Sequence, residues 1–587
     1  GDMTNIAYSA TNTPAVSFAY NRLGQQVTVT DATGTRAFTY NDALQLAAET
    51  NVMGEITRSY DALGRNTGFT INPSLPSYSV LYSFDDLGRF SSLFSLVNGA
   101  PHSWTYSYLP GSDLLSGISN GAFQITRTYE PNRDLLTSVE NRYGGTMISR
   151  YDYVNDSLGR RTQRVDARPS APDTLNAFLY NARSELTKAV MGPDQFGYLY
   201  DPIGNRITSS SNALELFYAA NELNQYTEIA NGGTRRLFYD LDGNATNDGH
   251  FAFEWDAENR LIAADNGTVR VENAYDYMGR RFGKTVYSWA GNHWSLTSAR
   301  TFLYDDWNLI QERIEESRGE GGTPTEQPAA GGGAVETTPG FGGTPPGQGG
   351  EPPGQDKKNG ATARAAATAG ASGGSETSGG GTTVCSTNYF VWGLDLSGSL
   401  QGAGGIGGLL ARSHGYSGGA GTWSTHHAYH ADGGGNITAL VASNQTLSAT
   451  YKYDPYGRSV STSGSMAAAN TQRFSSKEII PSTGFYYYGY RFYDPEHQRW
   501  LNRDPIGELG FQSSMGNGHM PPTRLLAPKR GCTSGGGSTA DANLLTDWPN
   551  LYLFVNNSPT SKLDIFGLAI MPPPPFQGPG FPFAPNC

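Results

Sequence analysis

The amino-acid sequence predicts an all-β protein in which β-hairpins of similar length stack side by side along a strip. Seven times, an aromatic residue that is followed directly by Asp or Asn has a glycine four positions later. The first aromatics recur about every twenty residues, at Tyr20, Tyr40, Tyr60 and Phe84, and a fixed period of this size is typical of repeat proteins. Segments between the motifs, such as residues 26–30 and 36–40, alternate β-branched and aromatic residues with polar ones, as strands do.

Each motif is predicted to be the turn between two strands. The seven pairs are Tyr20 and Gly24, Tyr60 and Gly64, Phe84 and Gly88, Tyr200 and Gly204, Tyr239 and Gly243, Tyr275 and Gly279, and Tyr453 and Gly457. Glycine can take the positive φ that a short hairpin loop requires, and Asp or Asn can hydrogen-bond to its own turn. We expect the aromatic to pack on the next hairpin, because a single hairpin is not stable alone.

An arginine often follows the glycine, at Arg65, Arg89, Arg160, Arg280 and Arg458. A planar guanidinium can pair with a carboxylate and stack on a tyrosine at once. We therefore expect each arginine to join its hairpin to the carboxylate and the tyrosine of a neighbouring hairpin.

This motif and its period resemble the Rhs or YD-repeat proteins, which include bacterial polymorphic toxins, the C component of insecticidal toxin complexes and the animal teneurins. The resemblance covers most of residues 15–314 and 386–568. It implies that the repeats form a long β-sheet strip that spirals into a hollow, cocoon-like shell. Residues 1–314 and 386–475 would be YD repeats, and residues 476–568 a C-terminal core domain.

Composition argues against several classes of partner. The 587 residues carry a net charge of -12, which opposes binding to nucleic acid. We find no run of eighteen apolar residues that would span a membrane and no visible signal peptide. The chain opens almost inside a repeat, which suggests a fragment of a longer polypeptide. The resemblance implies a secreted or cell-surface bacterial protein.

Two segments are predicted to interrupt the repeats. Residues 315–385 are rich in Gly, Pro and Ala, a composition that favours disorder, and the strands on either side are expected to pair. A second insert is expected at about 511–547. The three cysteines, Cys385, Cys532 and Cys587, lack the spacing of a metal site or a disulfide framework.

The histidines His426, His427 and His430 could suggest a metal site, but their segment runs into a Gly-rich turn and a strand rather than a helix. They also match a Tyr-His variant of the repeat. We therefore predict neither a metal nor a cofactor.

Residues 484–510 and 550–568 closely resemble the Rhs-associated core domain. In the toxins this domain closes the shell and cuts its own chain just beyond a final Asp-Pro-x-Gly-Leu. The resemblance places the catalytic residues at Arg491, Asp504 and Asp564, and the cut between Leu568 and Ala569. This chain departs from the pattern because Ile565, not proline, follows Asp564.

Two neighbouring carboxylates are what peptide hydrolysis by an aspartic mechanism needs, since one can keep a proton while the other deprotonates water. Arg491 would orient a carboxylate, and the chain would supply its own substrate in a single turnover. A purely structural interpretation stays open, in which Asp504-Pro is a turn and Arg491 pairs with Asp494 in a sheet.

Only 19 residues, seven of them proline, follow the expected cut, at 569–587. This Pro-rich tail is too short for a folded effector. One hypothesis is therefore a shell that encloses and releases a C-terminal effector, here absent or truncated, with an N-terminal capping or secretion-system partner. The alternative is a non-catalytic extracellular adhesin that binds a surface glycan or another partner. A diffusible hydrolase lacks its motifs.

Overall fold

The structure is a computed structural model that describes residues 2–72, 77–97, 99–169, 171–318, 382–415, 425–505 and 550–571. The chain divides into two units, one of residues 1–316 with 385–587 and the other of residues 317–384. The second unit has only its two ends among the described residues. The description that follows is of the first unit.

The predicted all-β class is confirmed, because the described residues form large antiparallel sheets and only very short 3-10 helices. The first sheet has 22 strands, in which each strand pairs with the one that follows it. Its strands are β1 (Asn5–Ile6), β2 (Val16–Tyr20), β3 (Gln26–Asp31), β4 (Gly34–Tyr40), β5 (Leu46–Asn51), β6 (Gly54–Tyr60), β7 (Asn66–Asn72), β8 (Tyr78–Phe84), β9 (Phe90–Val97), β10 (Ala100–Tyr108), β11 (Leu115–Asn120), β12 (Phe123–Tyr129), β13 (Leu136–Tyr143), β14 (Thr146–Asn155), β15 (Arg161–Arg168), β16 (Ala171–Tyr180), β17 (Leu186–Met191), β18 (Asp194–Tyr200), β19 (Arg206–Ser211), β20 (Leu214–Ala220), β21 (Tyr226–Ala230) and β22 (Thr234–Arg236).

The second sheet has 14 strands, and a single residue separates it from the end of the first sheet. Its strands are β23 (Phe238–Tyr239), β24 (Ala245–Asn247), β25 (Ala252–Trp255), β26 (Leu261–Asp265), β27 (Val269–Tyr275), β28 (Arg281–Trp289), β29 (Trp294–Asp305), β30 (Asn308–Arg318), β31 (Thr382–Trp392), β32 (Leu409–His414), β33 (Thr425–Ala431), β34 (Ile437–Ala442), β35 (Leu447–Tyr453) and β36 (Ser459–Ser463). Two small sheets follow, with β37 (Glu478–Ile479), β38 (Tyr486–Tyr487), β39 (Phe492–Asp494) and β40 (Arg499–Trp500), then β41 (Leu563–Ile565) and β42 (Ala569–Met571). The described 3-10 turns include η1 (Phe474–Ser476) and η4 (Val555–Asn557).

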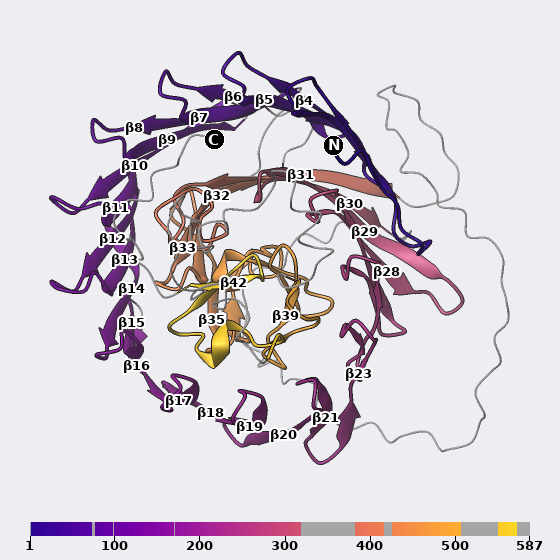
Figure 1. The fold of residues 1–587 in the computed structure, drawn as a ribbon. Coiled ribbons are helices and arrows are strands. Elements are labelled where there is room, and N and C mark those ends of the chain that lie inside the picture. Colours follow the sequence, from indigo (N-terminus) through magenta and orange to yellow (C-terminus); the bar gives the residue numbers. More distant parts are fainter. Residues whose placement is uncertain are drawn as a thin grey trace, which may run out of the picture. The chain divides into compact units, whose positions relative to one another are not determined.

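Within this unit, the strands follow a curved path, and β31 to β35 lie inside the curve of the first sheet (Figure 1). Side-chain contacts join the two. Tyr78 of β8 donates to the backbone oxygen of Phe390 at 2.7 Å, and Lys452 of β35 binds Asp194 at 2.9 Å. The inner face of the strip is therefore covered by later parts of the same chain.

The predicted pairing across the first interruption agrees with the structure, since β30 and β31 are neighbours in the second sheet. These strands extend into the predicted insert 315–385, because β30 continues to Arg318 and β31 begins at Thr382. The rest of that segment and the expected insert 511–547 lie outside the described residues, as do Cys532 and Cys587. Cys385 is exposed on β31.

The turn chemistry follows the prediction closely. All seven motif glycines have positive φ, between +77° and +92°. In the turn at Asp61, Oδ1 accepts hydrogen bonds from the backbone N–H groups of Leu63 and Arg65, both at 2.9 Å. The carboxylate thus holds the backbone of its own turn, which is the Asx-turn behaviour expected of this residue.

The arginines act partly as predicted. Arg65 stacks over the ring of Phe84 at 4.2 Å, in the next motif. Its ion pair, however, is with Asp61 of its own turn, at 2.6 Å, and not with a neighbouring hairpin. For Arg65 the carboxylate of its own turn takes this place, because the tight turn brings residues four positions apart side by side. Arg89 also lies 3.9 Å from Asp113 of the next turn, as predicted.

A second set of contacts was not predicted. Motif tyrosines donate their hydroxyl hydrogen bonds back to the first strand residue after the preceding turn. Tyr60 binds the Leu46 carbonyl oxygen and Tyr200 binds that of Leu186, both at 2.8 Å. Each aromatic ring therefore fixes the spacing of successive hairpins as well as burying apolar area.

One motif glycine also meets a buried ring. A Cβ on Gly457 would lie 2.6 Å from the ring of Phe474, whereas a Cβ on Gly24 would meet nothing within 4 Å. Both have positive φ, so Gly24→Ala is expected to cost about 1–2 kcal/mol of backbone strain. Gly457→Ala adds overpacking, and we expect a further cost of about 1–3 kcal/mol. Urea unfolding midpoints of the two variants test this, and equal shifts would contradict it.

Candidate functional site

The C-terminal part of the chain brings the three predicted site residues together. Arg491 lies in the turn between β38 and β39, Asp504 follows β40, and Asp564 is the middle residue of β41. Around them packs an aromatic cluster in which Tyr493 stacks on Phe554 with ring centres 3.9 Å apart. The buried rings hold these short strands, which are too small to be stable alone.

Arg491 is the centre of the arrangement. Its Nη2 lies 2.8 Å from Asp504 Oδ2 and 3.6 Å from Asp564 Oδ2. Its guanidinium also stacks over the Trp500 ring at 4.2 Å. The side chains of Arg491 and Asp564 are each 2% exposed, and that of Asp504 is 18% exposed. Of the two carboxylates, Asp504 is thus the one that water can reach.

Arg491 also holds the backbone beside the expected cut. Its Nε donates a hydrogen bond to the carbonyl oxygen of Gly567, and its Nη1 donates to that of Leu551 at 3.2 Å. Gly567 has φ +75°, and a Cβ there would lie 3.1 Å from Arg491 Cβ. The glycine therefore permits both the turn and the close approach of the arginine.

The expected scissile peptide lies in a tight hairpin. β41 and β42 pair in antiparallel register, with Asp564 opposite Ile570 and Ile565 opposite Ala569. Leu568 closes the turn, since its N–H donates to the Ile565 oxygen at 3.0 Å. Asp564 and the Leu568–Ala569 bond are thus parts of one hairpin.

In the structure, Arg491 does not pair with Asp494, contrary to the purely structural interpretation. Asp494 contacts the Nδ1 atom of His497 instead, and Arg491 contacts Asp504 and Asp564. The absence of proline after Asp564 allows the following residue, Ile565, to pair within the hairpin. Chemically, the arrangement offers two carboxylates that share one cation, and that cation also binds the Gly567 carbonyl oxygen.

Sequence reasoning missed Lys477, which lies close to this site. Its Nζ donates to the Gly404 carbonyl oxygen at 2.7 Å and lies 5.5 Å from the ring centre of Phe566. Burial lowers the pKa of Lys477 to about 8, although the charges of Asp395 and Asp564 raise it. A single lysine outside the matched motifs gives no sequence signal, because its partner Gly404 comes from a distant loop.

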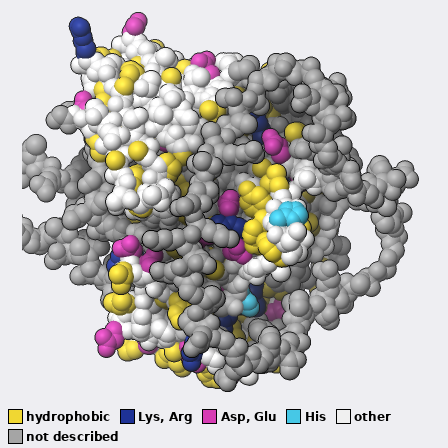
Figure 2. Space-filling model, turned by 90° about the vertical axis from the view of Figure 1, so that its right-hand side faces the viewer, with side chains coloured by type: hydrophobic (Ala, Val, Ile, Leu, Met, Phe, Trp, Pro, Cys, Tyr) yellow, Lys and Arg dark blue, Asp and Glu magenta, His cyan; other side chains and the backbone are white. Residues whose placement is uncertain are grey.

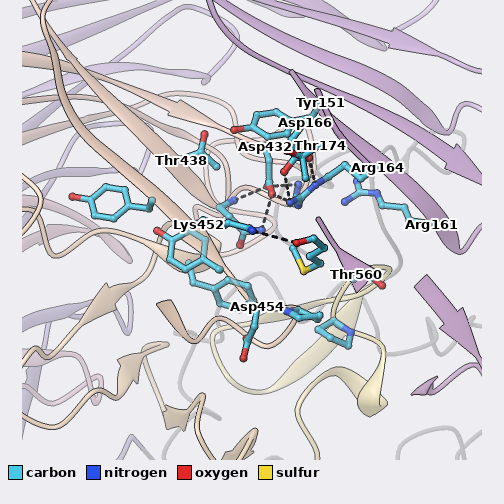
Figure 3. A pocket seen from close by; sticks show the side chains of 18 of the residues that line it. Tyr151, Arg161, Arg164, Asp166, Thr174, Asp432, Thr438, Lys452, Asp454 and Thr560 are labelled. Carbon is cyan, nitrogen blue, oxygen red and sulfur yellow. Dashed lines mark hydrogen bonds and ion pairs between the residues drawn. The ribbon is translucent and has the colours of Figure 1, made fainter. Parts of the chain in front are cut away.

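A separate pocket of about 250 Å³ lies between β14, β15 and the strands β34 and β35. In Figure 3, Arg164 points toward Asp166 and Asp432, with which it forms ion pairs of 2.6 and 3.1 Å. Lys452 donates to the Met191 backbone oxygen at 3.3 Å. The pocket is not lined by Arg491, Asp504 or Asp564.

The histidines singled out in the sequence lie on β33. His426 and His427 bind Ser413 and Ser448, at 2.7 and 3.0 Å. His430 is fully buried against Phe123, and burial lowers its pKa to about 3. The strand turns His427 to the opposite face from the other two, as its period of two requires.

One face of the molecule, seen in Figure 2, carries acidic and basic side chains in small groups among apolar ones. Within the described part of the chain, no helix is long and apolar enough to cross a membrane.

Comparison with known sequences relates part of this chain to a family. The family model described as Teneurin YD-shell matches residues 111–292. Residues 111–292 are therefore similar to a YD-shell, as the repeat motif predicts. The chain also resembles a crystal structure of TcdB2-TccC3-Cdc42, with a TM-score of 0.50 and 15% identity, over 95% of this chain and 28% of that one. That likeness concerns the fold.

Two curated relatives match shorter stretches. Toxin subunit YenC2 of Yersinia entomophaga is 44% identical over 80 residues, which is 13% of this chain and 8% of the relative. The tRNA nuclease WapA of Bacillus subtilis (strain 168) is 32% identical over 120 residues, 18% of this chain and 5% of that protein. The chain thus matches under a tenth of the length of either relative.

Proposed function

We propose that this chain encloses its own C-terminal segment and releases it by a single self-cleavage after Leu568. The observation that supports this is the position of Arg491, which contacts both Asp504 and Asp564 and the carbonyl next to the scissile peptide. The three residues come from separate segments and contact one another through Arg491.

In the proposed reaction, Asp504 is the base, because it is the more exposed carboxylate and contacts Arg491 directly. It takes a proton from a water molecule whose oxygen adds to the Leu568 carbonyl carbon. Asp564 gives its proton to the Ala569 nitrogen as the carbon–nitrogen bond breaks. The products are a carboxylate at Leu568 and a free amine at Ala569.

Arg491 has two roles in this proposal. It keeps Asp504 ionised through a charge-assisted hydrogen bond, and its bond to the Gly567 oxygen fixes the loop that presents the bond. Because the substrate is held in the same hairpin as Asp564, its effective concentration is high and one turnover is sufficient.

Partners follow from the same proposal. The cargo is the chain's own C-terminal segment or an effector attached there, and a capping or secretion-system partner would close the N-terminal end. The toxin subunit among the relatives supports a secreted or surface-exposed protein.

Intact mass of the purified chain, wild type beside Asp504→Asn, tests the function. Wild type is expected to end at Leu568, with a separate peptide that begins at Ala569, while the variant keeps the joined chain. Identical masses with the tail attached in both would refute self-cleavage and favour the non-catalytic alternative, a surface protein that binds a glycan or another partner.

A further inference from the structure

A cluster of three buried side chains lies at the junction between the strip and the small C-terminal sheet. Asp248 is in the turn between β24 and β25, Asp494 ends β39, and His497 is in the turn before β40. One donor atom from each residue lies within 4.8 Å of the other two. The three residues are 3%, 3% and 4% exposed.

Backbone groups fix the orientation of both carboxylates. Asp248 Oδ1 accepts from the N–H groups of His250 and Phe251, at 2.8 and 2.7 Å. Asp494 Oδ1 accepts from the N–H groups of Glu496 and His497, at 2.8 and 3.2 Å. In each case Oδ1 is engaged by the turn, which leaves Oδ2 of Asp248 for another ligand, while Oδ2 of Asp494 contacts His497 Nδ1.

The histidine supplies a third donor. His497 Nδ1 contacts Asp494 Oδ2, and within the described part of the chain its Nε2 is buried without a hydrogen-bond partner. In the same part of the chain, the hydrogen bonds of Asp248 are made by its Oδ1 atom. A buried polar atom without a partner is costly, and a ligand is one way to satisfy it.

We propose that Asp248, Asp494 and His497 bind a divalent transition-metal ion, with zinc as the representative. One imidazole nitrogen and two carboxylate oxygens are ligands that zinc accepts, with a fourth position for water. The two carboxylates give the site a charge of -2 when the imidazole is neutral. Nearby, Arg235 lies 3.7 Å from the Glu496 carboxylate and offsets the charge of Glu496.

The metal would join two parts of the fold that are far apart in the sequence. Asp248 belongs to the strip close to the break between the large sheets, and the other two ligands belong to the C-terminal core. Binding would therefore stabilise the docking of the core on the strip, since a ligand that binds only the folded state raises its stability. This inference is independent of self-cleavage.

The test uses the full chain, stripped of metal with a chelator and titrated with zinc chloride against a chromophoric competitor. We expect a site in wild type that Asp248→Asn weakens at least about tenfold, together with a rise in melting temperature on adding zinc. Asp248→Asn leaves the contact between Asp494 and His497 in place. The matched control is His250→Ala, which removes an exposed histidine of the same turn and should keep the site.

Several outcomes would overturn the proposal. The first is a wild-type chain that binds no zinc, and the second is zinc binding that is equally tight in Asp248→Asn. The third is a zinc site that disappears when His250, or His427 of β33, is replaced. If Asp248→Asn is unfolded without metal, His497→Gln takes its place in the same titration. A His497→Gln chain that still binds zinc as tightly as wild type would also contradict the proposal. Cobalt substitution gives a second measurement, because visible bands of a four-coordinate nitrogen and oxygen site are expected only when these ligands bind.

Discussion

Replacing Arg491 with methionine is expected to abolish self-cleavage and to destabilise the core domain. The variant leaves Asp504 and Asp564 close together without the cation that both contact. It also removes the hydrogen bonds to the oxygens of Leu551 and Gly567. Losing one partner from a buried ion pair typically costs about 3–5 kcal/mol. Intact mass and urea unfolding measure the two effects.

The catalytic and structural parts of this effect can be separated. Arg491→Lys keeps the charge but cannot reach two carboxylates and two carbonyl oxygens at once. We expect a folded protein whose tail is released far more slowly. Arg499→Lys is the matched control, because Arg499 is also buried in this domain but donates to the backbone oxygen of Asn224 and to the side-chain oxygens of Asn205 and Asn550.

Arg499→Lys should lower stability and leave cleavage of the folded chain unchanged. If Arg491→Lys releases the tail as fast as wild type, the arginine has no part in the reaction. If both lysine variants slow release equally, the effect is one of folding alone.

The second large effect is expected at Glu478, which binds two buried cations. Arg281 is 0% exposed and Lys284 is 2% exposed, and both contact the Glu478 carboxylate. Glu478→Gln leaves these charges without their anion. We expect a loss of about 3–5 kcal/mol in the free energy of unfolding near pH 7.

The effect of Glu478→Gln on stability is expected to depend on pH in a definite direction. Burial alone would raise the pKa of Glu478, but Arg281 and Lys284 lower it to about 2. Because the folded pKa is below the unfolded value of 4.5, the contribution is present above pH 4.5 and is lost as the pH falls toward 2. The stability difference between wild type and Glu478→Gln should therefore narrow over that range.

Urea unfolding at several pH values measures this difference. The control is Glu130→Gln, which removes a largely surface pair with Arg133 and should change stability by about 0–1 kcal/mol. If the free energy of unfolding of Glu478→Gln runs parallel to that of wild type between pH 5 and 3, the Glu478 carboxylate is not held ionised by its neighbours.

Much of the repeat architecture could be read from the residues themselves. The spacing of aromatic, acidic and glycine residues predicted each turn, because positive φ and the Asx hydrogen bond are decided within a few residues. The stack of Arg65 on Phe84 was also predicted, since a period near twenty residues brings the next aromatic alongside.

What the sequence determined by itself was local. It determined where the hairpins lie, their order, and the need of each hairpin to pack on the next. Each of these depends on neighbouring residues and on a constant period. Arg491, Asp504 and Asp564 were indicated by resemblance, whereas their convergence is a product of tertiary structure. The same holds for Lys477 beside Gly404 and for Asp248 beside His497. Such contacts join segments that are remote in the chain, and only the folding of the strip onto its own C-terminal core brings them within reach.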